Sequence, residues 1–337
     1  MNSAFFEQYQ KPIILSILCG LVIILLTATW QGAMEIRWEN LFDSESIEYY
    51  IIWQIRIPRT LAALLVGGGL AISGAIMQGL FRNPLVEPGI IGVSSGAGLF
   101  AALAIVLGVQ FLPSLFAILG DYALPLAACL GGWVVTSILY LFSRNKRGIS
   151  ISSMLLIGIA INAFTGALIG LLTFIADETE LRSLTFWTMG SLSSFNYEKI
   201  AIIAVVQLIF IPLLCFKARA MNAMLLGERE AKHLGIEVEK LKRMQIWGVA
   251  IITGSAVAFA GGIGFIGLLI PHLIRMLFGS DNRFVLPLSY LFGGILLIVA
   301  DLFSRTLAAP SEIPIGILTA FIGAPFLAYL VYKQGRS

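Results

Sequence analysis

The stretch of residues 244–274, MQIWGVAIITGSAVAFAGGIGFIGLLIPHLI, decides the fold, because the number of helices in it sets the topology of the whole chain. Its 31 residues include no Asp, Glu, Lys or Arg. A helix needs roughly 20 apolar residues to cross a bilayer, so this stretch is long for a single span. Gly261, Gly262, Gly264 and Pro271 interrupt it. These helix breakers predict two shorter helices in place of one.

The composition of the chain is that of an integral membrane protein. Hydrophobic residues make up 58% of the sequence and charged residues 12%, and the mean hydropathy is +0.92, all far from the values of soluble domains. We therefore predict an all-α integral membrane protein with one transmembrane domain over residues 1–337. The uncharged runs that meet or approach the length of a span are residues 12–34, 60–81, 88–120, 122–143, 148–176, 200–216, 244–274, 284–300 and 313–332.

The distribution of basic residues favours two helices in residues 244–274. Lys and Arg collect in short cytoplasmic loops of membrane proteins. With ten spans and a cytoplasmic N-terminus, 16 of the 22 Lys and Arg residues fall inside, whereas a single span there would leave 13 inside. We therefore predict about ten transmembrane helices with both termini in the cytoplasm. The run at 12–34 is predicted to be a span, since no small-residue cleavage pattern follows it.

A charged segment, residues 222–243, precedes this stretch and must face water. It reads NAMLLGEREAKHLGIEVEKLKR, and 9 of its 22 residues are charged. Apolar residues recur in it at helical intervals, and Gly227 and Gly235 allow the chain to stop and turn. The pattern predicts two short amphipathic helices. Because such a pair lies between membrane spans, a soluble partner that binds it can move the transmembrane helices.

A proline-broken turn interrupts the densest motif, residues 56–98. This motif reads RIPRTLAALLVGGGLAISGAIMQGLFRNPLVEPGIIGVSSGAG and breaks at residues 83–88, where two prolines forbid a regular helix. Irregular backbone at membrane depth survives only where protein buries it or where it lines an aqueous cavity, so the break is a candidate constriction of a pathway. The alternative is a simple cytoplasmic turn in which Asn83 caps a helix.

Several function classes find no support in the residues. The chain has no GxxxxGK[ST] motif, so it cannot bind ATP by a P-loop of its own. The three cysteines stand singly in different apolar runs, and the net charge of +3 indicates no nucleic-acid partner. An ion-coupled secondary transporter is expected to carry paired ionisable residues within the membrane, whereas Asp301 stands nearly alone. A membrane-embedded enzyme would need a polar cluster, and the two histidines lie far apart in the sequence.

Several blocks of the sequence together resemble one family of transport proteins. They are the charged segment, the motif at 56–98, GGIGFIGLLIPHLIRMLFGSDNR at 261–283, and IVADLFSRTLAAPSEIPIGILTAFIGAPFLAYL at 298–330. In their order along the chain, these blocks resemble the permease subunits of FecCD-type binding-protein-dependent ABC importers of iron chelates, haem and cobalamin. The resemblance implies the type II ABC importer permease fold in the bacterial inner membrane. It further implies a homodimer surrounded by lipid, with two ATP-binding subunits, which carry ATP and Mg, and a periplasmic substrate-binding protein.

The resemblance also assigns roles to residues on the cytoplasmic side. The charged segment is similar to the family's coupling helices, which sit in a cleft of each ATPase, although Lys232 replaces the second alanine of the EAA-type pattern. The turn after residue 82 is similar to the cytoplasmic gate, assisted by the loop at 143–150. The residues implied in coupling are Leu226, Gly227, Glu228, Glu230, Ala231, Leu234 and Gly235, and those implied in the gate are Asn83, Pro84 and Leu85.

Three arginines resemble residues that meet acidic side chains of the binding protein. They are Arg56, Arg59 and Arg305, which all fall outside in the ten-span topology. We expect them to be exposed there. The alternative is that they are interfacial anchors, with Arg305 in an i,i+4 pair with Asp301.

The region at 155–192, LLIGIAINAFTGALIGLLTFIADETELRSLTFWTMGSL, most resembles the haem permeases of the family. Haem is therefore the expected substrate, with a ferric siderophore or cobalamin as the alternative. Arg182 can meet a propionate at the outer mouth, and Met154 and Met189 can line an apolar passage. In the alternative interpretation, Arg182 is an interfacial anchor and the two methionines are packing residues of the core. We expect no metal or cofactor on this subunit.

Overall fold

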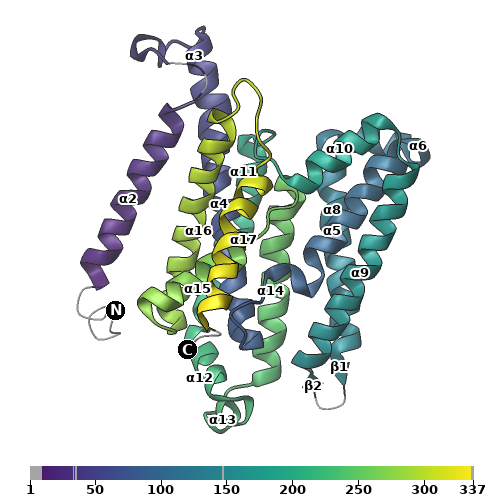
Figure 1. The fold of residues 1–337 in the computed structure, drawn as a ribbon, viewed down its shortest axis with the longest axis vertical. Coiled ribbons are helices and arrows are strands. Elements are labelled where there is room, and N and C mark those ends of the chain that lie inside the picture. The colour runs from purple at the N-terminus through teal and green to yellow at the C-terminus, as the bar shows by residue number, and fades with distance from the viewer. Residues whose placement is uncertain (1–9, 33, 35, 146–147, 335–337) are drawn as a thin grey trace. The chain divides into compact units, whose positions relative to one another are not determined.

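The protein is helical throughout most of its length in a computed structural model, which describes residues 10–32, 34, 36–145 and 148–334 (Figure 1). The chain divides into two compact units. Unit 1 comprises Met1–Ala75, Ser191–Gln207 and Ile263–Ser337, and unit 2 comprises Ile76–Gly190 and Leu208–Gly262. Two of the four boundaries fall inside helices, so the long helices α4 and α11 each contribute to both units.

The helices of unit 1 come from the two ends of the sequence and from one short internal piece. They are α2 (Gln10–Trp30), α3 (Ile47–Tyr50), the first part of α4 (Ile57–Phe81), the first part of α11 (Tyr197–Cys215), α15 (Ile266–Phe278), α16 (Asn282–Thr306) and α17 (Ile315–Gln334). A 3₁₀ turn at Trp38–Asn40 and a π-helical segment at Ile51–Arg56 lie between α2 and α4.

Unit 2 holds the middle of the sequence and one small antiparallel hairpin. Its elements are the end of α4, α5 (Val93–Leu103), α6 (Val109–Phe111), α7 (Pro113–Leu119), α8 (Ala123–Ser143), β1 (Arg144–Asn145), β2 (Gly148–Ile149), α9 (Ile151–Ile175), α10 (Glu178–Met189), the end of α11, α12 (Ala218–Leu226), α13 (Glu228–His233) and α14 (Val238–Ala260). A π-helical segment at Ala104–Gly108 follows α5, and 3₁₀ turns occupy Pro88–Ile91 and Gly120–Tyr122.

Seven helical stretches of the described chain are long and apolar enough to cross a membrane. They are Ile47–Phe81, Val93–Phe111, Pro113–Ser143, Ile151–Ile175, Tyr197–Cys215, Val238–Ala260 and Asn282–Thr306. Three shorter apolar helices accompany them, at Leu15–Trp30, Ile266–Phe278 and Ile315–Tyr329. The predicted all-α membrane fold is confirmed, with the hairpin β1–β2 as a small local departure.

The predicted division of residues 244–274 is confirmed. Helix α14 ends at Ala260 and α15 begins at Ile266. Gly261 has a φ of +71°, and a Cβ there would collide with the carbonyl oxygen of Trp187, so this position requires glycine. Pro271 lies within α15, so the break comes from the glycine-rich sequence before it and not from the proline.

Close helix contacts at glycine pairs hold each unit together. In unit 1, Gly74 on α4 lies against the backbone of Gly267, so tightly that a side chain would not fit. In unit 2, Gly96 on α5 and Gly131 on α8 meet in the same way. Small residues let helix backbones approach in lipid, where van der Waals packing replaces the hydrophobic effect between helices. The space beside Gly166 and Gly170 on α9 is open, so these two glycines pack against nothing in the described chain.

Candidate functional site: a charged helix pair and an arginine cluster

The charged segment folds into the two predicted short helices, α12 and α13, at the end of unit 2 that also carries the hairpin (Figure 1). Gly227 separates them with a φ of +139°, and Gly235 ends the pair with a φ of +80°. Leu226 is 72% exposed and Leu234 is 65% exposed, although charged residues surround both. Large apolar side chains exposed on a polar element are typical of a protein contact surface.

Buried contacts hold this pair to the rest of unit 2. Ala231 of α13 is fully buried, and Met221 and Met224 of α12 are each 3% exposed. Glu228, at the first position of α13, forms an ion pair with Lys242 of α14, with 2.8 Å between Oε2 and Nζ. The pair α12–α13 therefore presents one face to water and is anchored through the other.

Lys242 is a buried lysine that the sequence analysis missed. Its Nζ donates to Glu228 Oε2 at 2.8 Å, to Glu239 Oε1 at 3.2 Å and to the carbonyl oxygen of Ile149 at 3.0 Å. A lysine ammonium has three N–H donors, so all three have partners. Taking a charge out of water costs several kcal/mol per ion, which such a complete set of acceptors offsets.

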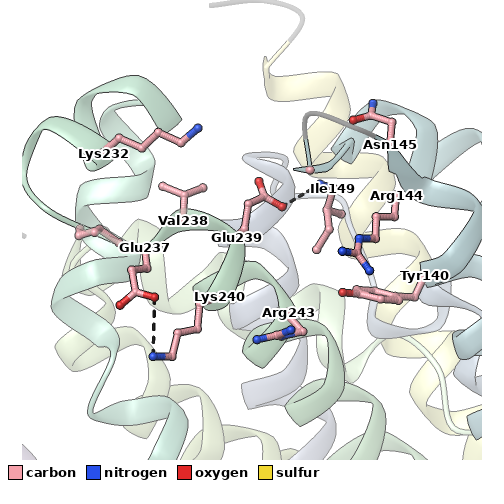
Figure 2. Close-up of a pocket in the computed structure, with 12 residues that line it drawn as sticks. Tyr140, Arg144, Asn145, Ile149, Lys232, Glu237, Val238, Glu239, Lys240 and Arg243 are labelled. Carbon is pink, nitrogen blue, oxygen red and sulfur yellow. Dashed lines mark hydrogen bonds and ion pairs between the residues drawn. The ribbon is translucent and has the colours of Figure 1, made fainter.

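Glu239 joins α14 to the hairpin between α8 and α9. Its Oε2 accepts a hydrogen bond of 2.8 Å from the backbone N–H of Ile149, as Figure 2 shows. Gly148 has a φ of +115°, and its Cα lies so close to the Glu239 carboxylate that a Cβ would collide with it. The hairpin is thus shaped around this carboxylate.

A water-accessible cavity of about 750 Å³ opens beside the hairpin (Figure 2). Tyr140 and Arg144 line it from α8 and β1, and Arg243 lines it from α14. Within it, Glu237 and Lys240 form an exposed ion pair with 3.7 Å between Lys240 Nζ and Glu237 Oε2. Among the described residues, no group of three His, Cys, Asp or Glu side chains has an arrangement that could hold a metal ion.

The predicted break after α4 is present. Helix α4 ends at Phe81, and α5 begins only at Val93. Asn83 Oδ1 accepts a hydrogen bond of 3.0 Å from the backbone N–H of Leu85, so Asn83 stabilises its own turn and does not cap a following helix. Leu85 is 40% exposed and Pro84 is half-buried. The gate at Asn83, Pro84 and Leu85 stays a prediction.

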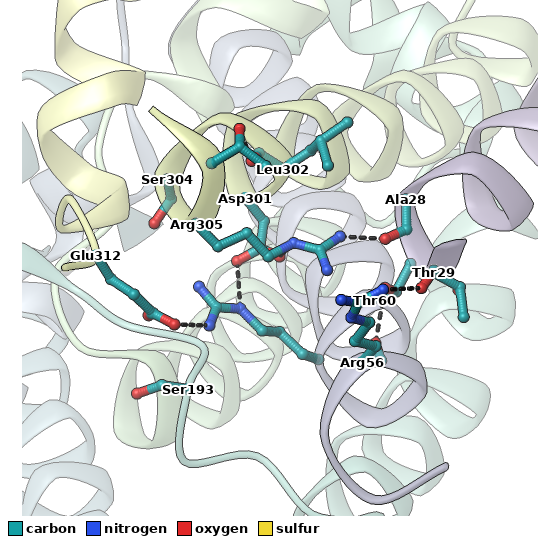
Figure 3. Close-up of polar contacts among 12 residues, drawn as sticks. Ala28, Thr29, Arg56, Thr60, Ser193, Asp301, Leu302, Ser304, Arg305 and Glu312 are labelled. Atoms are coloured by element: carbon teal, nitrogen blue, oxygen red, sulfur yellow. Dashed lines mark hydrogen bonds and ion pairs between the residues drawn. The ribbon is translucent and has the colours of Figure 1, made fainter. Parts of the chain in front are cut away.

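The arginines expected on the surface are buried in unit 1. Arg56 and Arg59 are each 5% exposed and Arg305 is 8% exposed, which corrects the expectation of exposed guanidinium groups. Arg59 Nε lies 2.7 Å from Asp301 Oδ1, and its Nη1 lies 2.6 Å from Glu312 Oε1. The Asp301 carboxylate also forms an ion pair with Arg305, with 3.5 Å between Arg305 Nε and Asp301 Oδ2. This is the i,i+4 pair that the alternative interpretation predicts. Figure 3 shows this cluster.

Two of these arginines also hold the C-terminal end of α2. Arg56 donates to the carbonyl oxygens of Trp30 and Met34, each at 2.6 Å. Arg305 donates to the carbonyl oxygen of Ala28 (Figure 3). The last carbonyl groups of a helix lack partners within it, and cations are favourable at this end of the helix dipole. That a binding protein docks on Arg56, Arg59 and Arg305 stays a prediction. The contacts of these arginines in the structure hold parts of this chain together.

The residues expected in the substrate passage belong to α9 and α10 of unit 2. Arg182 is exposed on α10, with its guanidinium carbon 5.7 Å from the centre of the Phe186 ring. Met189 is half-buried at the end of α10, and Met154 is fully buried in α9, as expected of a packing residue. Their role in a passage stays a prediction.

A mostly helical domain with several candidate membrane spans and an exposed, charged helix pair has the features of a polytopic transport permease. It belongs to the FecCD transport family, whose model matches residues 12–333. The hemin transport system permease protein HmuU of Yersinia pestis is 42% identical over 316 residues, which cover 93% of each chain. The vitamin B12 import system permease protein BtuC of Escherichia coli O17:K52:H18 is 39% identical over 334 residues, 98% of each chain.

A solved structure has the same fold. It is described as an inward-facing conformation of a metal-chelate type ABC transporter, and it aligns with a TM-score of 0.84 and 36% sequence identity. The alignment covers 96% of this chain and 99% of the other. The chain is therefore the permease component of an ABC importer and a multi-pass inner-membrane protein, and it works together with other subunits such as ATPases. The predicted family and the permease fold are confirmed.

Proposed function

We propose that this chain is the membrane subunit of an ABC importer that moves haem across the inner membrane. The observation that carries the mechanism is the exposed pair α12–α13, which presents Leu226 and Leu234 to water on a charged surface. Two partner subunits bind and hydrolyse ATP with Mg. Each of them binds the helix pair of one permease copy in a cleft. The permease itself holds no cofactor and turns the motion of its partners into opening and closing of a pathway.

Haem is the proposed substrate because of the similarity to the hemin permease of Yersinia pestis. A large, flat, apolar molecule with two carboxylates suits a passage through an apolar membrane domain with a basic residue such as Arg182 near it. Cobalamin and ferric siderophores are the competing substrates, since the similarity to the vitamin B12 permease is almost as high.

The test is uptake by vesicles that contain the permease with its ATP-binding partners and its binding protein. Haemin, cobalamin and several ferric siderophores are offered in parallel, each with and without ATP. We expect ATP-dependent uptake of haemin at least about tenfold above that of the others. ATP-dependent uptake of cobalamin or a siderophore alone would replace haem as the substrate. Uptake driven by an ion gradient without the ATP-binding partners would contradict the importer mechanism itself.

The working unit in this proposal is a homodimer. Only 17% of the most apolar part of α9 is buried within the chain, and the space beside Gly166 and Gly170 is open. A helix with open small residues can pack closely against another helix in lipid. A second copy of the chain is the proposed partner. The excess of Lys and Arg in and around the charged segment supports a cytoplasmic position for it and for both termini.

A cross-linking prediction tests the dimer and its gate together. Leu85 lies in the turn between α4 and α5 and is 40% exposed, so a cysteine there is accessible without disturbing a core. If the turns of two copies meet at the twofold axis, Leu85→Cys should form a disulfide between copies under mild oxidation, in at least one nucleotide state. The matched control is Ile118→Cys, which is 82% exposed in α7, outside both the turn and the proposed dimer helix α9. A turn that never cross-links in any nucleotide state is not the gate.

A further inference from the structure

Lys242 is buried in a segment whose neighbouring basic residues face water. Its side chain is 2% exposed, whereas that of Lys240, two residues earlier, is 69% exposed. Lys240 pairs with Glu237 across 3.7 Å in water, where such pairs contribute little. The different burial of two lysines in one helical turn calls for a specific explanation of Lys242.

The three acceptors of Lys242 belong to three different parts of unit 2. Glu228 is at the start of α13, Glu239 is in the first turn of α14, and Ile149 is in the hairpin between α8 and α9. An apolar side chain would fill the same space but would make no directional bonds. The ammonium group therefore fixes α13 and the hairpin relative to each other at a single point.

Glu239 doubles the connection to the hairpin. One carboxylate oxygen binds Lys242, and the other accepts the backbone N–H of Ile149. Together with the Lys242 bond to the Ile149 carbonyl oxygen, both main-chain groups of this residue are engaged. Gly148 leaves the space that the carboxylate occupies. The hairpin cannot move away from α14 without losing one buried and one partly buried hydrogen bond to a charged side chain, and such bonds are among the stronger ones in proteins.

We propose that Lys242 and Glu239 form a rigid link that carries a displacement of α13 to the α8–α9 hairpin. Lys242 is then a positioning residue for transport. The inference rests on the proposed function, in which partner ATPases move α12 and α13. The hairpin joins α8 to α9, and α8 packs along α5, the helix that follows the proline-broken turn. A push on α13 therefore reaches the helices beside that turn without passing through Gly227 and Gly235 at either end of α13.

The functional test compares Lys242→Met with Lys240→Met in the full transporter in vesicles. Both variants replace a lysine by the same apolar residue, two positions apart, once in the link and once on the exposed face. Haem uptake and ATP hydrolysis are measured in the same vesicles. We expect the amount of haem taken up per ATP hydrolysed to fall at least about tenfold for Lys242→Met and to stay within about twofold of the native value for Lys240→Met. An unchanged ratio in Lys242→Met would overturn the inference.

A second measurement does not depend on transport. Spin labels on the exposed residues Lys232 of α13 and Asn145 of the hairpin report the distance between the two elements. We expect one narrow distance distribution in the native chain and with Lys240→Met, and a broad one with Lys242→Met. If Lys242→Met fails to assemble, Glu228→Ala replaces it, because it removes the oxygen that accepts from Lys242 at a side chain that is 38% exposed. A distribution that stays narrow without the Lys242 to Glu228 bond would refute the link.

The two failures are distinguishable. If the native transporter moves no haem, the proposed substrate is wrong, while the spin-label distances still decide whether the link is rigid. If the native transporter moves haem and the distances do not respond to Lys242→Met, the link is wrong and the proposed function stands.

Discussion

Haem uptake is expected to fall below about a tenth of the native rate when Leu234 is replaced by Asp. Leu234 follows α13 and is 65% exposed, so the change removes no core contact and leaves the chain folded. In the proposed function, the Leu234 side chain enters the cleft of a partner ATPase. Truncating a central apolar contact of an interface costs about 2 kcal/mol or more, and burying an unpaired carboxylate adds to this.

The control for this experiment is Leu234→Met, which keeps an apolar side chain of similar volume. We expect it to retain most of the uptake, because such swaps are well tolerated. ATP hydrolysis by the whole complex and co-purification of the ATP-binding subunits are measured beside uptake. If the Asp variant co-purifies with its partners and transports at the native rate, then the pair α12–α13 is not where the partners bind.

The second large effect is expected for Asp301→Ala in unit 1. Asp301 is 1% exposed and forms ion pairs with both Arg59 and Arg305, which are themselves buried. Removing one partner of a buried ion pair costs about 3 to 5 kcal/mol, because the remaining charge is left uncompensated. We therefore expect a clear fall in the thermal melting temperature of the purified protein in detergent.

Glu312→Ala is the matched control for Asp301→Ala. Glu312 binds the same arginine, with 2.6 Å between Arg59 Nη1 and Glu312 Oε1, but its side chain is 44% exposed. Exposed pairs contribute about 0 to 1 kcal/mol, so the melting temperature should hardly change. Equal melting temperatures for the two variants would mean that the Asp301 carboxylate does not stabilise the arginine cluster. The same Glu312 variant tests the docking prediction separately, because it removes one of the two carboxylates bound to Arg59. If Arg59 contacts a binding protein, the affinity of that protein for the transporter should change.

Local signals in the sequence predicted the helix breaks and the helix pair. Gly261 and Gly227 end helices because of their own backbone conformations, with φ of +71° and +139°, and the charge density around Gly227 requires water. Such features depend on a few neighbouring residues. They can therefore be recognised without knowledge of the tertiary structure.

The ion pairs could be predicted only in part. Arg305 and Asp301 lie four residues apart on one helix, so their pairing followed from helical geometry. Arg59 and Asp301 lie 242 positions apart, and nothing in the sequence brings them together. The expectation that the arginines are exposed was wrong because they also bind groups from distant parts of the chain. Arg59 binds the carboxylates of Asp301 and Glu312, while Arg56 and Arg305 bind carbonyl oxygens at the end of α2.

The burial of Lys242 left a signal that was available in the sequence. Val238, Leu241, Gln245 and Ile246 fall on one face of α14 at helical spacing, and each is at most 5% exposed. Lys242 is on the same face, four residues after Val238. A charged residue in register with apolar ones predicts a buried ion pair, whereas composition alone places it among the water-facing residues.

The end of α2 is held through its main chain. Arg56 and Arg305 bind carbonyl oxygens of Ala28 and Trp30, which every amino acid presents in the same way. This form of attachment does not depend on which side chains the helix carries near its end. We expect the last turn of α2 to tolerate replacement by other apolar residues, as in a block of leucines, while neither arginine tolerates a shorter or uncharged substitute. The amino-acid sequence at the end of α2 can therefore vary, whereas its attachment depends on two arginines from other parts of the chain.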